Sequence, residues 1–252
     1  MSATQPALPF AIAHRGASGT APENTLAAIH RAATLGATWV EIDAAVTADG
    51  EAVLHHDDTI DRCSDGSGLL LGQTLNSLAE RDFGAWFAPR FAGERLAHLR
   101  DAAALCAELG LGCNLEIKVT GGWDEPTARA VCDIAAVWPT ARSTLLISSF
   151  SERGLQVAAA RVPAVPRALL VDIPPENWRA RLADTESTAL HCADTALLSR
   201  ARLAPVLDAG FPVRVYTVDD PKRAEALRAM GVSSVFTNHP ERFPAAGKQL
   251  AP

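Results

Sequence analysis

The chain has 252 residues, of which 48% are hydrophobic and 21% are charged. This length suits one large domain, and the composition is that of a globular protein, so extensive disorder is not expected. The formal net charge is −6 and basic residues form no cluster, which gives no sign of a nucleic-acid interface or a polybasic membrane patch. An anionic ligand would need a local positive centre, because the overall charge repels it.

The N-terminal sequence MSATQPALPFAIAHRG lacks the basic region and long apolar stretch of a signal peptide. No apolar run approaches the roughly 18 residues of a transmembrane helix. The five cysteines form no CxxC pair, and we expect them to be reduced thiols in the core. These features predict a cytoplasmic protein without stable membrane insertion, and they give no indication of an oligomeric state.

Strand-like and helix-like segments alternate along the chain, and four of the helix-like segments end at a glycine, as helices commonly do. In chain order, the sequence predicts a strand at 10–14, a helix at 23–35, a strand at 39–46, a helix at 96–109 and a strand at 111–119. A helix at 126–137, a strand at 143–150, a helix at 151–162, and strands at 166–173 and 189–193 follow. The last elements are a helix at 200–208, a strand at 212–218, a helix at 221–230 and a strand at 233–237.

Eight strands with helical crossovers favour an α/β fold of the closed (β/α)₈ TIM-barrel type. A doubly wound open sheet is the alternative, but the Gly-x-Gly-x-x-Gly turn of dinucleotide-binding proteins is missing. No Pro/Ser-rich linker divides the chain, so we expect one domain over residues 1–252.

One crossover, at approximately 49–95, is far longer than a barrel needs. A long irregular segment inside a compact domain is usually functional. We therefore expect a small insertion after the second barrel strand, above the C-terminal face of the barrel, where active sites are built.

Three acidic residues stand out by their positions in predicted strands. Glu41 and Asp43 are two residues apart and so face the same side of their strand, and Glu116 stands near the end of the next barrel strand, with Lys118 on its face. Carboxylates among apolar residues are costly to bury unless they are paired or bind a metal. Their convergence at a barrel mouth favours one divalent cation, Mg²⁺ or Ca²⁺. An ion-pair network with Lys118 and Arg15 is the structural alternative.

Two histidines end apolar runs: His14 in Ala-His-Arg-Gly and His56 in Val-Leu-His-His-Asp. Histidine can act as acid or base near neutral pH, although a structural role is the commoner fate of a single histidine. Arg15 offers a planar guanidinium for phosphate oxygens. Glycines after the first strand suggest a loop that could bind an anion, and Glu23 is either a further metal ligand or an acid at a helix N-terminus. His191 could be structural or functional.

Several motifs in fixed order resemble those of the glycerophosphodiester phosphodiesterase family. They are HRG (14–16), PENT (22–25), EIDAAVTADG (41–50), HDDTIDR (56–62), NLEIK (114–118), VYTVDD (215–220) and GVSSVFTNHP (231–240). The resemblance covers nearly the full length of the chain. It implies metal-dependent hydrolysis of glycerophosphodiesters to sn-glycerol 3-phosphate and an alcohol.

The resemblance also implies roles for individual residues. His14 and His56 would be the acid/base pair, and Glu41, Asp43 and Glu116 the metal ligands. Arg15, Lys118, Phe150 and Tyr216 would contact the substrate, and the insertion would shape its pocket. Tyr216 stands where many relatives carry Trp, and Asn238 where an Asp is frequent. The resemblance is to the cytoplasmic bacterial type.

Two other functions fit parts of the sequence. A related barrel that cleaves phospholipids or inositol phosphodiesters would need to reach a bilayer, and the aromatic residues Trp86, Phe87 and Phe91 could serve there, although packing inside the protein is the expectation. A non-catalytic barrel that binds phosphorylated ligands would not need an acid/base pair. The sequence leaves open the head group, the choice of cation, the acid and base assignment, and whether water or the glycerol 2-hydroxyl attacks.

Overall fold

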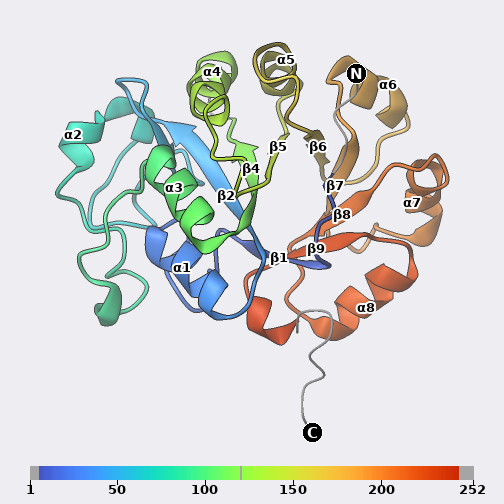
Figure 1. The fold of residues 1–252 in the computed structure, drawn as a ribbon, viewed down its shortest axis with the longest axis horizontal. Coiled ribbons are helices and arrows are strands. Elements are labelled where there is room, and N and C mark those ends of the chain that lie inside the picture. Colours follow the sequence, from blue (N-terminus) through green and yellow to red (C-terminus); the bar gives the residue numbers. More distant parts are fainter. Residues whose placement is uncertain (1–5, 120, 244–252) are drawn as a thin grey trace, which may run out of the picture.

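A computed structural model of the protein describes residues 6–119 and 121–243. Residues 1–5, 120 and 244–252 of the expected domain lie outside this part. In it, eight parallel strands close into a barrel with helices around it (Figure 1). Closure occurs at β1, which pairs in parallel with both β2 and β9. Around the barrel the strands are β1 (Ala11–His14), β2 (Trp39–Val46), β4 (Gly112–Ile117), β5 (Leu145–Ser149), β6 (Arg167–Val171), β7 (Ala189–Ala193), β8 (Val213–Tyr216) and β9 (Ser234–Thr237).

The (β/α)₈ TIM barrel is therefore confirmed, and the open-sheet alternative is wrong. Every predicted strand range contains one barrel strand. The helices that follow the strands are α1 (Leu26–Thr34), α3 (Leu99–Leu109), α4 (Asp124–Ala135), α5 (Glu152–Arg161), α6 (Trp178–Asp184), α7 (Arg200–Leu207) and α8 (Pro221–Ala229). Helix α6 was not predicted, because its seven residues make barely two turns and show little periodicity.

Helix α1 begins three residues later than predicted. Thr25 caps it: the Thr25 side-chain oxygen accepts a hydrogen bond from the Ala28 N–H at 3.1 Å. Asn24, just before the cap, has a φ of 57°, which is outside the helical region. Residues 22–25 therefore form a turn above the barrel mouth instead of the first turn of the helix.

The predicted insertion follows the second barrel strand. It carries β3 (Ala52–Leu54), antiparallel to β2, the short helix α2 (Leu75–Leu78) and the 3₁₀ turns η1 (Leu70–Gly72) and η2 (Pro89–Phe91). A further 3₁₀ turn, η3 (Pro240–Arg242), lies near the C-terminus. A separate apolar cluster joins residues of the insertion to Ala45 of β2. Its other members are Val53, Ile60, Leu70, Leu78 and Phe83. This cluster anchors the insertion to β2 and β3.

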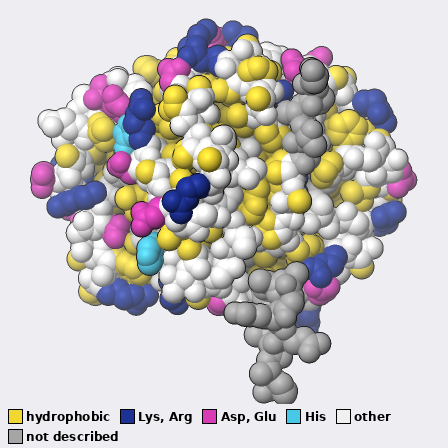
Figure 2. Space-filling model, in the orientation of Figure 1, with side chains coloured by type: hydrophobic (Ala, Val, Ile, Leu, Met, Phe, Trp, Pro, Cys, Tyr) yellow, Lys and Arg dark blue, Asp and Glu magenta, His cyan; other side chains and the backbone are white. Residues whose placement is uncertain are grey.

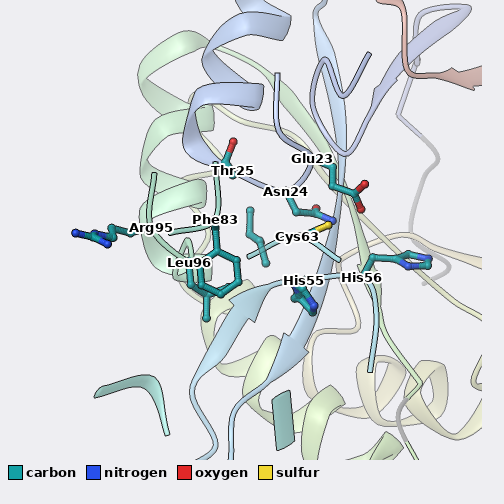
Figure 3. A pocket seen from close by; sticks show the side chains of 10 residues that line it. Glu23, Asn24, Thr25, His55, His56, Cys63, Phe83, Arg95 and Leu96 are labelled. Carbon is teal, nitrogen blue, oxygen red and sulfur yellow. The ribbon is translucent and has the colours of Figure 1, made fainter. Parts of the chain in front are cut away.

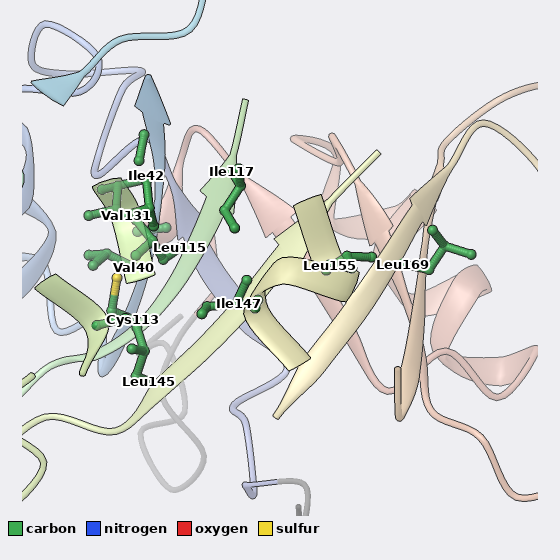
Figure 4. Packing of buried hydrophobic residues seen from close by; sticks show 14 of the residues in the cluster. Val40, Ile42, Cys113, Leu115, Ile117, Val131, Leu145, Ile147, Leu155 and Leu169 are labelled. Carbon is green, nitrogen blue, oxygen red and sulfur yellow. The ribbon is translucent and has the colours of Figure 1, made fainter. Parts of the chain in front are cut away.

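Two apolar layers hold the barrel together. One fills the space between strands and helices, where Ile42, Leu115 and Val131 pack (Figure 4). The other joins Ile12, Trp39, Leu146 and Phe236 from different strands. Since side chains alternate along a strand, Ile12 and Trp39 share a face with His14 and Glu41. This second layer therefore closes the barrel beneath the candidate site.

Charged side chains of both signs lie on the surface. Acidic and basic side chains are interspersed on the face that Figure 2 displays. In the described parts of the chain, no helix has the length and apolar character needed to span a membrane. All five cysteines are buried and unbonded, as predicted.

Candidate active site

The three predicted metal ligands meet at the C-terminal ends of two neighbouring barrel strands. Asp43 on β2 is in register with Glu116 on β4, and Glu41 lies two residues before Asp43 on the same face. One carboxylate oxygen from each of the three residues lies within 4.8 Å of the others. Glu41 and Asp43 are almost completely buried. The strand register thus brings together three acids that lie up to 75 residues apart in the sequence.

Two basic residues lie against these acids. Arg15 Nε is 3.1 Å from Asp43 Oδ2, and the Arg15 backbone N–H donates to Glu41 Oε2 at 2.9 Å. Lys118 Nζ is 2.8 Å from Glu116 Oε1 and 3.4 Å from Asp43 Oδ1. The ion-pair network that the sequence left open is therefore present around the same carboxylates that could hold a cation.

The two positive charges of Arg15 and Lys118 do not balance the negative charges of the three carboxylates. Burial and the nearby Asp43 and Glu116 raise the pKa of Glu41 well above its ordinary value. Burial and Asp43 raise the pKa of Glu116 to about 7. Burial also opposes ionisation of Asp43, but Lys118 and Arg15 outweigh it and hold the pKa of Asp43 below its usual range.

The donor set fits a hard divalent cation. Glu41 Oε1 is buried, and no described residue forms a hydrogen bond to it. A buried acceptor left without a partner costs free energy, and a bound cation would remove that cost. Oxygen ligands from three carboxylates suit Mg²⁺ or Ca²⁺.

His14, the last residue of β1, is held by an amide. Its Nδ1 lies 2.8 Å from Asn238 Oδ1. Asn238 Nδ2 donates to Asp219 Oδ2 at 2.8 Å, which fixes the amide so that its oxygen faces the imidazole. An oxygen acceptor requires His14 Nδ1 to carry the proton, and Nε2 is then the basic nitrogen. Burial and the charge of Arg15 lower the pKa of His14 to about 4.

His56 is held by a carboxylate instead. Its Nδ1 lies 2.6 Å from Asp57 Oδ1. Arg62 Nε donates to the other Asp57 oxygen at 2.7 Å, and these hydrogen bonds from Arg62 and His56 lower the pKa of Asp57. The imidazole of His56 thus lies beside a negative charge. The two histidines therefore have partners of different charge.

Glu23 is paired with two arginines. It accepts hydrogen bonds from Arg15 at 2.7 Å and from Arg62 at 2.6 Å, and it lies before the first turn of α1. The next residue, Asn24, brackets Asp43: Asn24 Nδ2 donates to Asp43 Oδ2 at 2.7 Å, and the Asp43 N–H donates to Asn24 Oδ1 at 3.0 Å. Glu23 thus positions two arginines, and Asn24 orients a predicted ligand.

A small pocket beside His56 shows how the insertion meets the barrel (Figure 3). His55 and His56 extend in different directions from adjacent positions, and His55 Nε2 lies 2.9 Å from the Thr59 carbonyl oxygen. Burial raises the pKa of the Cys63 thiol to about 12, so this cysteine is not a nucleophile at neutral pH. These residues are structural neighbours of the site.

The main cavity has a volume of about 160 Å³. Phe150 and Tyr216 form one wall, with their rings edge to face at 6.0 Å between centroids. Asp43 is the one predicted site residue that does not line it. The lining residues are His14, Arg15, Glu41, His56, Asn114, Glu116, Lys118, Ser148, Phe150, Leu170, His191, Tyr216, Thr217 and Phe236.

The insertion borders this cavity at one position. Of residues 49–95, His56 alone is among the lining residues. Trp86, Phe87 and Phe91 pack on one another, with ring centroids 5.7 Å apart in each successive pair. The insertion thus contributes His56 to this cavity, and its wider part in shaping the substrate pocket stays a prediction.

Comparison with known proteins identifies the family of this chain. The model of the glycerophosphoryl diester phosphodiesterase family matches residues 14–242. The chain belongs to this family. It is similar to a glycerophosphodiester phosphodiesterase of Caldanaerobacter subterraneus subsp. tengcongensis, with 31% identity over 91% of this chain and 94% of that protein.

Solved structures of the family show the same fold. A phosphodiesterase of Oleispira antarctica, in complex with the product sn-glycerol-3-phosphate, has a TM-score of 0.90 and 34% identity, over 93% of this chain and 95% of that one. A glycerophosphodiester phosphodiesterase of Thermotoga maritima has a TM-score of 0.73 and 22% identity, over 95% and 98% of the two chains. The second comparison bears on the fold alone.

Proposed function

We propose that this family member hydrolyses glycerophosphodiesters to sn-glycerol 3-phosphate and an alcohol, with Glu41, Asp43 and Glu116 holding one divalent cation, Mg²⁺ or Ca²⁺. The observation that carries the proposal is the meeting, around one cavity, of three carboxylates and two histidines with different partners. A site that only binds phosphorylated ligands would need no such pair of histidines.

The charged residues of the site have matching tasks. A bound cation would supply Lewis-acid chemistry, polarising the phosphoryl group. Arg15 and Lys118 line the cavity, and their side chains would bind phosphate oxygens, the guanidinium through its planar pair of N–H groups. Burial of these groups strengthens their attraction for an anion, although the protein as a whole is negative.

The hydrogen-bond partners support different roles for the two histidines. His14 presents a neutral Nε2, because Asn238 requires the proton on Nδ1, and it would accept the proton of the attacking oxygen. His56 has its Nδ1 beside the Asp57 carboxylate at 2.6 Å, and its Nε2 would donate a proton to the departing alkoxide. Attack by water and attack by the glycerol 2-hydroxyl, through a cyclic phosphate, both fit this assignment.

Release of glycerol 3-phosphate from a panel of glycerophosphodiesters tests the proposal. The diesters would carry choline, ethanolamine, glycerol or inositol, and each would be assayed with Mg²⁺, Ca²⁺ or a chelator. We expect turnover with at least one cation and loss of turnover with the chelator. Equal turnover with chelator would contradict the metal site, and no turnover of any diester would contradict the enzyme and favour a ligand-binding barrel.

Binding to liposomes tests the related phospholipid-cleaving function. We expect the protein to stay in the supernatant, since Trp86, Phe87 and Phe91 pack on one another. Sedimentation with vesicles, together with cleavage of intact phospholipid, would favour a lipid substrate instead. The cytoplasmic location stays a prediction from the sequence.

A further inference from the structure

Two buried polar side chains line the inner part of the main cavity. Asn114 on β4 is 1% exposed and His191 on β7 is completely buried, yet both are among the cavity-lining residues. Asn114 lies two residues before Glu116, so its side chain shares the face of Glu116 about 7 Å further from the mouth. His191 is likewise two residues before Ala193, the residue in register with Tyr216. His191 therefore lies one layer deeper than the aromatic wall, and Asn114 lies one layer deeper than Asp43 and Glu116, level with Glu41 in the strand register.

Arg214 on β8 determines the state of His191. Arg214 Nη1 lies 3.1 Å from His191 Nε2, and a guanidinium can only donate. His191 Nε2 must therefore accept, which leaves the ring proton on Nδ1. Burial and the charge of Arg214 lower the pKa of His191 well below its ordinary value. His191 is thus a neutral hydrogen-bond donor of fixed tautomer and is unsuited to proton transfer near pH 7.

The Nδ1–H donor of His191 and the Oδ1 acceptor of Asn114 have no hydrogen-bond partner in the described part of the chain. The amide orientation follows from Asn114 Nδ2, which donates to Ser148 Oγ at 2.9 Å. Buried polar groups are rarely left unpaired. Both residues line the same cavity, and a ligand hydroxyl there, which donates and accepts, complements both kinds of group.

We propose that His191 and Asn114 recognise the terminal hydroxyl of the glycerol moiety and so select glycerol over alcohols that lack this hydroxyl. The inference rests on the proposed function. It places the phosphate beside the acids, the glycerol chain inward and the alcohol outward past Phe150, which is 40% exposed. The buried end of the cavity then determines specificity for glycerol, whereas the open end tolerates different alcohols.

The test compares two substrates in each protein: the best glycerophosphodiester of the panel and its 1-deoxy analogue, in which the terminal hydroxyl is replaced by hydrogen and the 2-hydroxyl remains. The ratio of their kcat/KM values is independent of the fraction of active protein. We expect wild type to prefer the glycerol substrate by about 10- to 100-fold. His191→Phe should reduce the ratio to near one, and His191→Gln, which keeps a donor and an acceptor, should restore part of it.

His30→Phe is the matched control. It makes the same change at an exposed position of α1 that does not line the cavity, so it should leave the ratio unchanged. A wild-type ratio near one would overturn the inference without any variant, and so would an unchanged ratio in folded His191→Phe, as expected if a buried water is the partner. Either result keeps the proposed function intact, whereas absence of turnover on the parent substrate would contradict the proposed function itself.

Discussion

His56 and Asp57, neighbours in the sequence, are joined by a hydrogen bond of 2.6 Å between Nδ1 and Oδ1. Adjacent residues on a regular strand point to opposite faces, and this contact forms because both residues follow the end of β3. The carboxylate fixes the tautomer of His56, leaving Nε2 as the nitrogen that exchanges a proton with substrate. Asp57 is therefore a positioning residue.

Asp57→Asn should lower kcat about 10- to 100-fold, within the range that acid/base catalysis contributes. The amide removes the negative charge beside His56 and no longer fixes its tautomer, and KM should change much less. Steady-state kinetics measures both constants. Asp58→Asn makes the same change in charge at the next, exposed position and should have little effect. Equal losses in the two variants would show that net charge is responsible.

The acid and base assignment predicts how the histidine variants respond to the leaving group. His14→Ala and His56→Ala should each nearly abolish turnover of a choline diester and leave the fold intact. With a p-nitrophenyl diester, whose leaving group needs no proton, His56→Ala should recover about 100-fold or more. His14→Ala should remain slow, because it lacks the base.

Circular dichroism of the same preparations would verify that both variants are folded. Recovery of His14→Ala and not of His56→Ala would reverse the assignment. A variant that keeps nearly normal turnover of the choline diester would remove that histidine from the mechanism.

Asn24→Ala should weaken cation binding about 10- to 100-fold, the usual effect of removing a group that orients a metal ligand. The substitution removes the two hydrogen bonds that bracket Asp43, at 2.7 Å and 3.0 Å. Calorimetric titration with Mg²⁺ or Ca²⁺ gives the affinity without an activity assay. Asn76→Ala, at an exposed position in α2, is the control, and an unchanged affinity in Asn24→Ala would show that Asp43 needs no such support.

The protein should lose stability in mild acid, and His191 should account for part of the loss. Its pKa is lowered in the folded state by burial and by Arg214, so the unfolded chain binds the proton more strongly. The contribution is complete above the ordinary pKa of 6.5 and is lost as the pH falls toward the folded-state value.

Chemical denaturation at several pH values measures this effect. Between pH 6 and 5, wild type should lose up to about 1.4 kcal/mol per pH unit more than His191→Gln, the slope for one proton. Parallel curves for the two proteins would show that the imidazole is not buried in neutral form.

The sequence predicted the barrel correctly because its signals are local. Strands such as Trp39–Val46 are apolar runs between turns, and alternation alone places Glu41 and Asp43 on one face. One helix boundary was predicted wrongly because it depends on a contact between distant parts of the chain. Helix α1 begins at Leu26 because Asn24 adopts a positive φ to hydrogen bond with Asp43, a constraint that comes from another strand.

By itself, then, the sequence determined the fold class and indicated the candidate acids, histidines and basic residues of the site. The order of the elements along the chain indicates the fold, and the order of the motifs indicates the candidates. Only the tertiary structure decided the partners: Asp57 for His56, Asn238 for His14 across 224 residues, and Arg214 for His191. These contacts depend on strand register and barrel closure, which bring together residues that no local pattern links. The physical difference between the two catalytic candidates, one beside a carboxylate and one beside an amide, exists only in the folded protein.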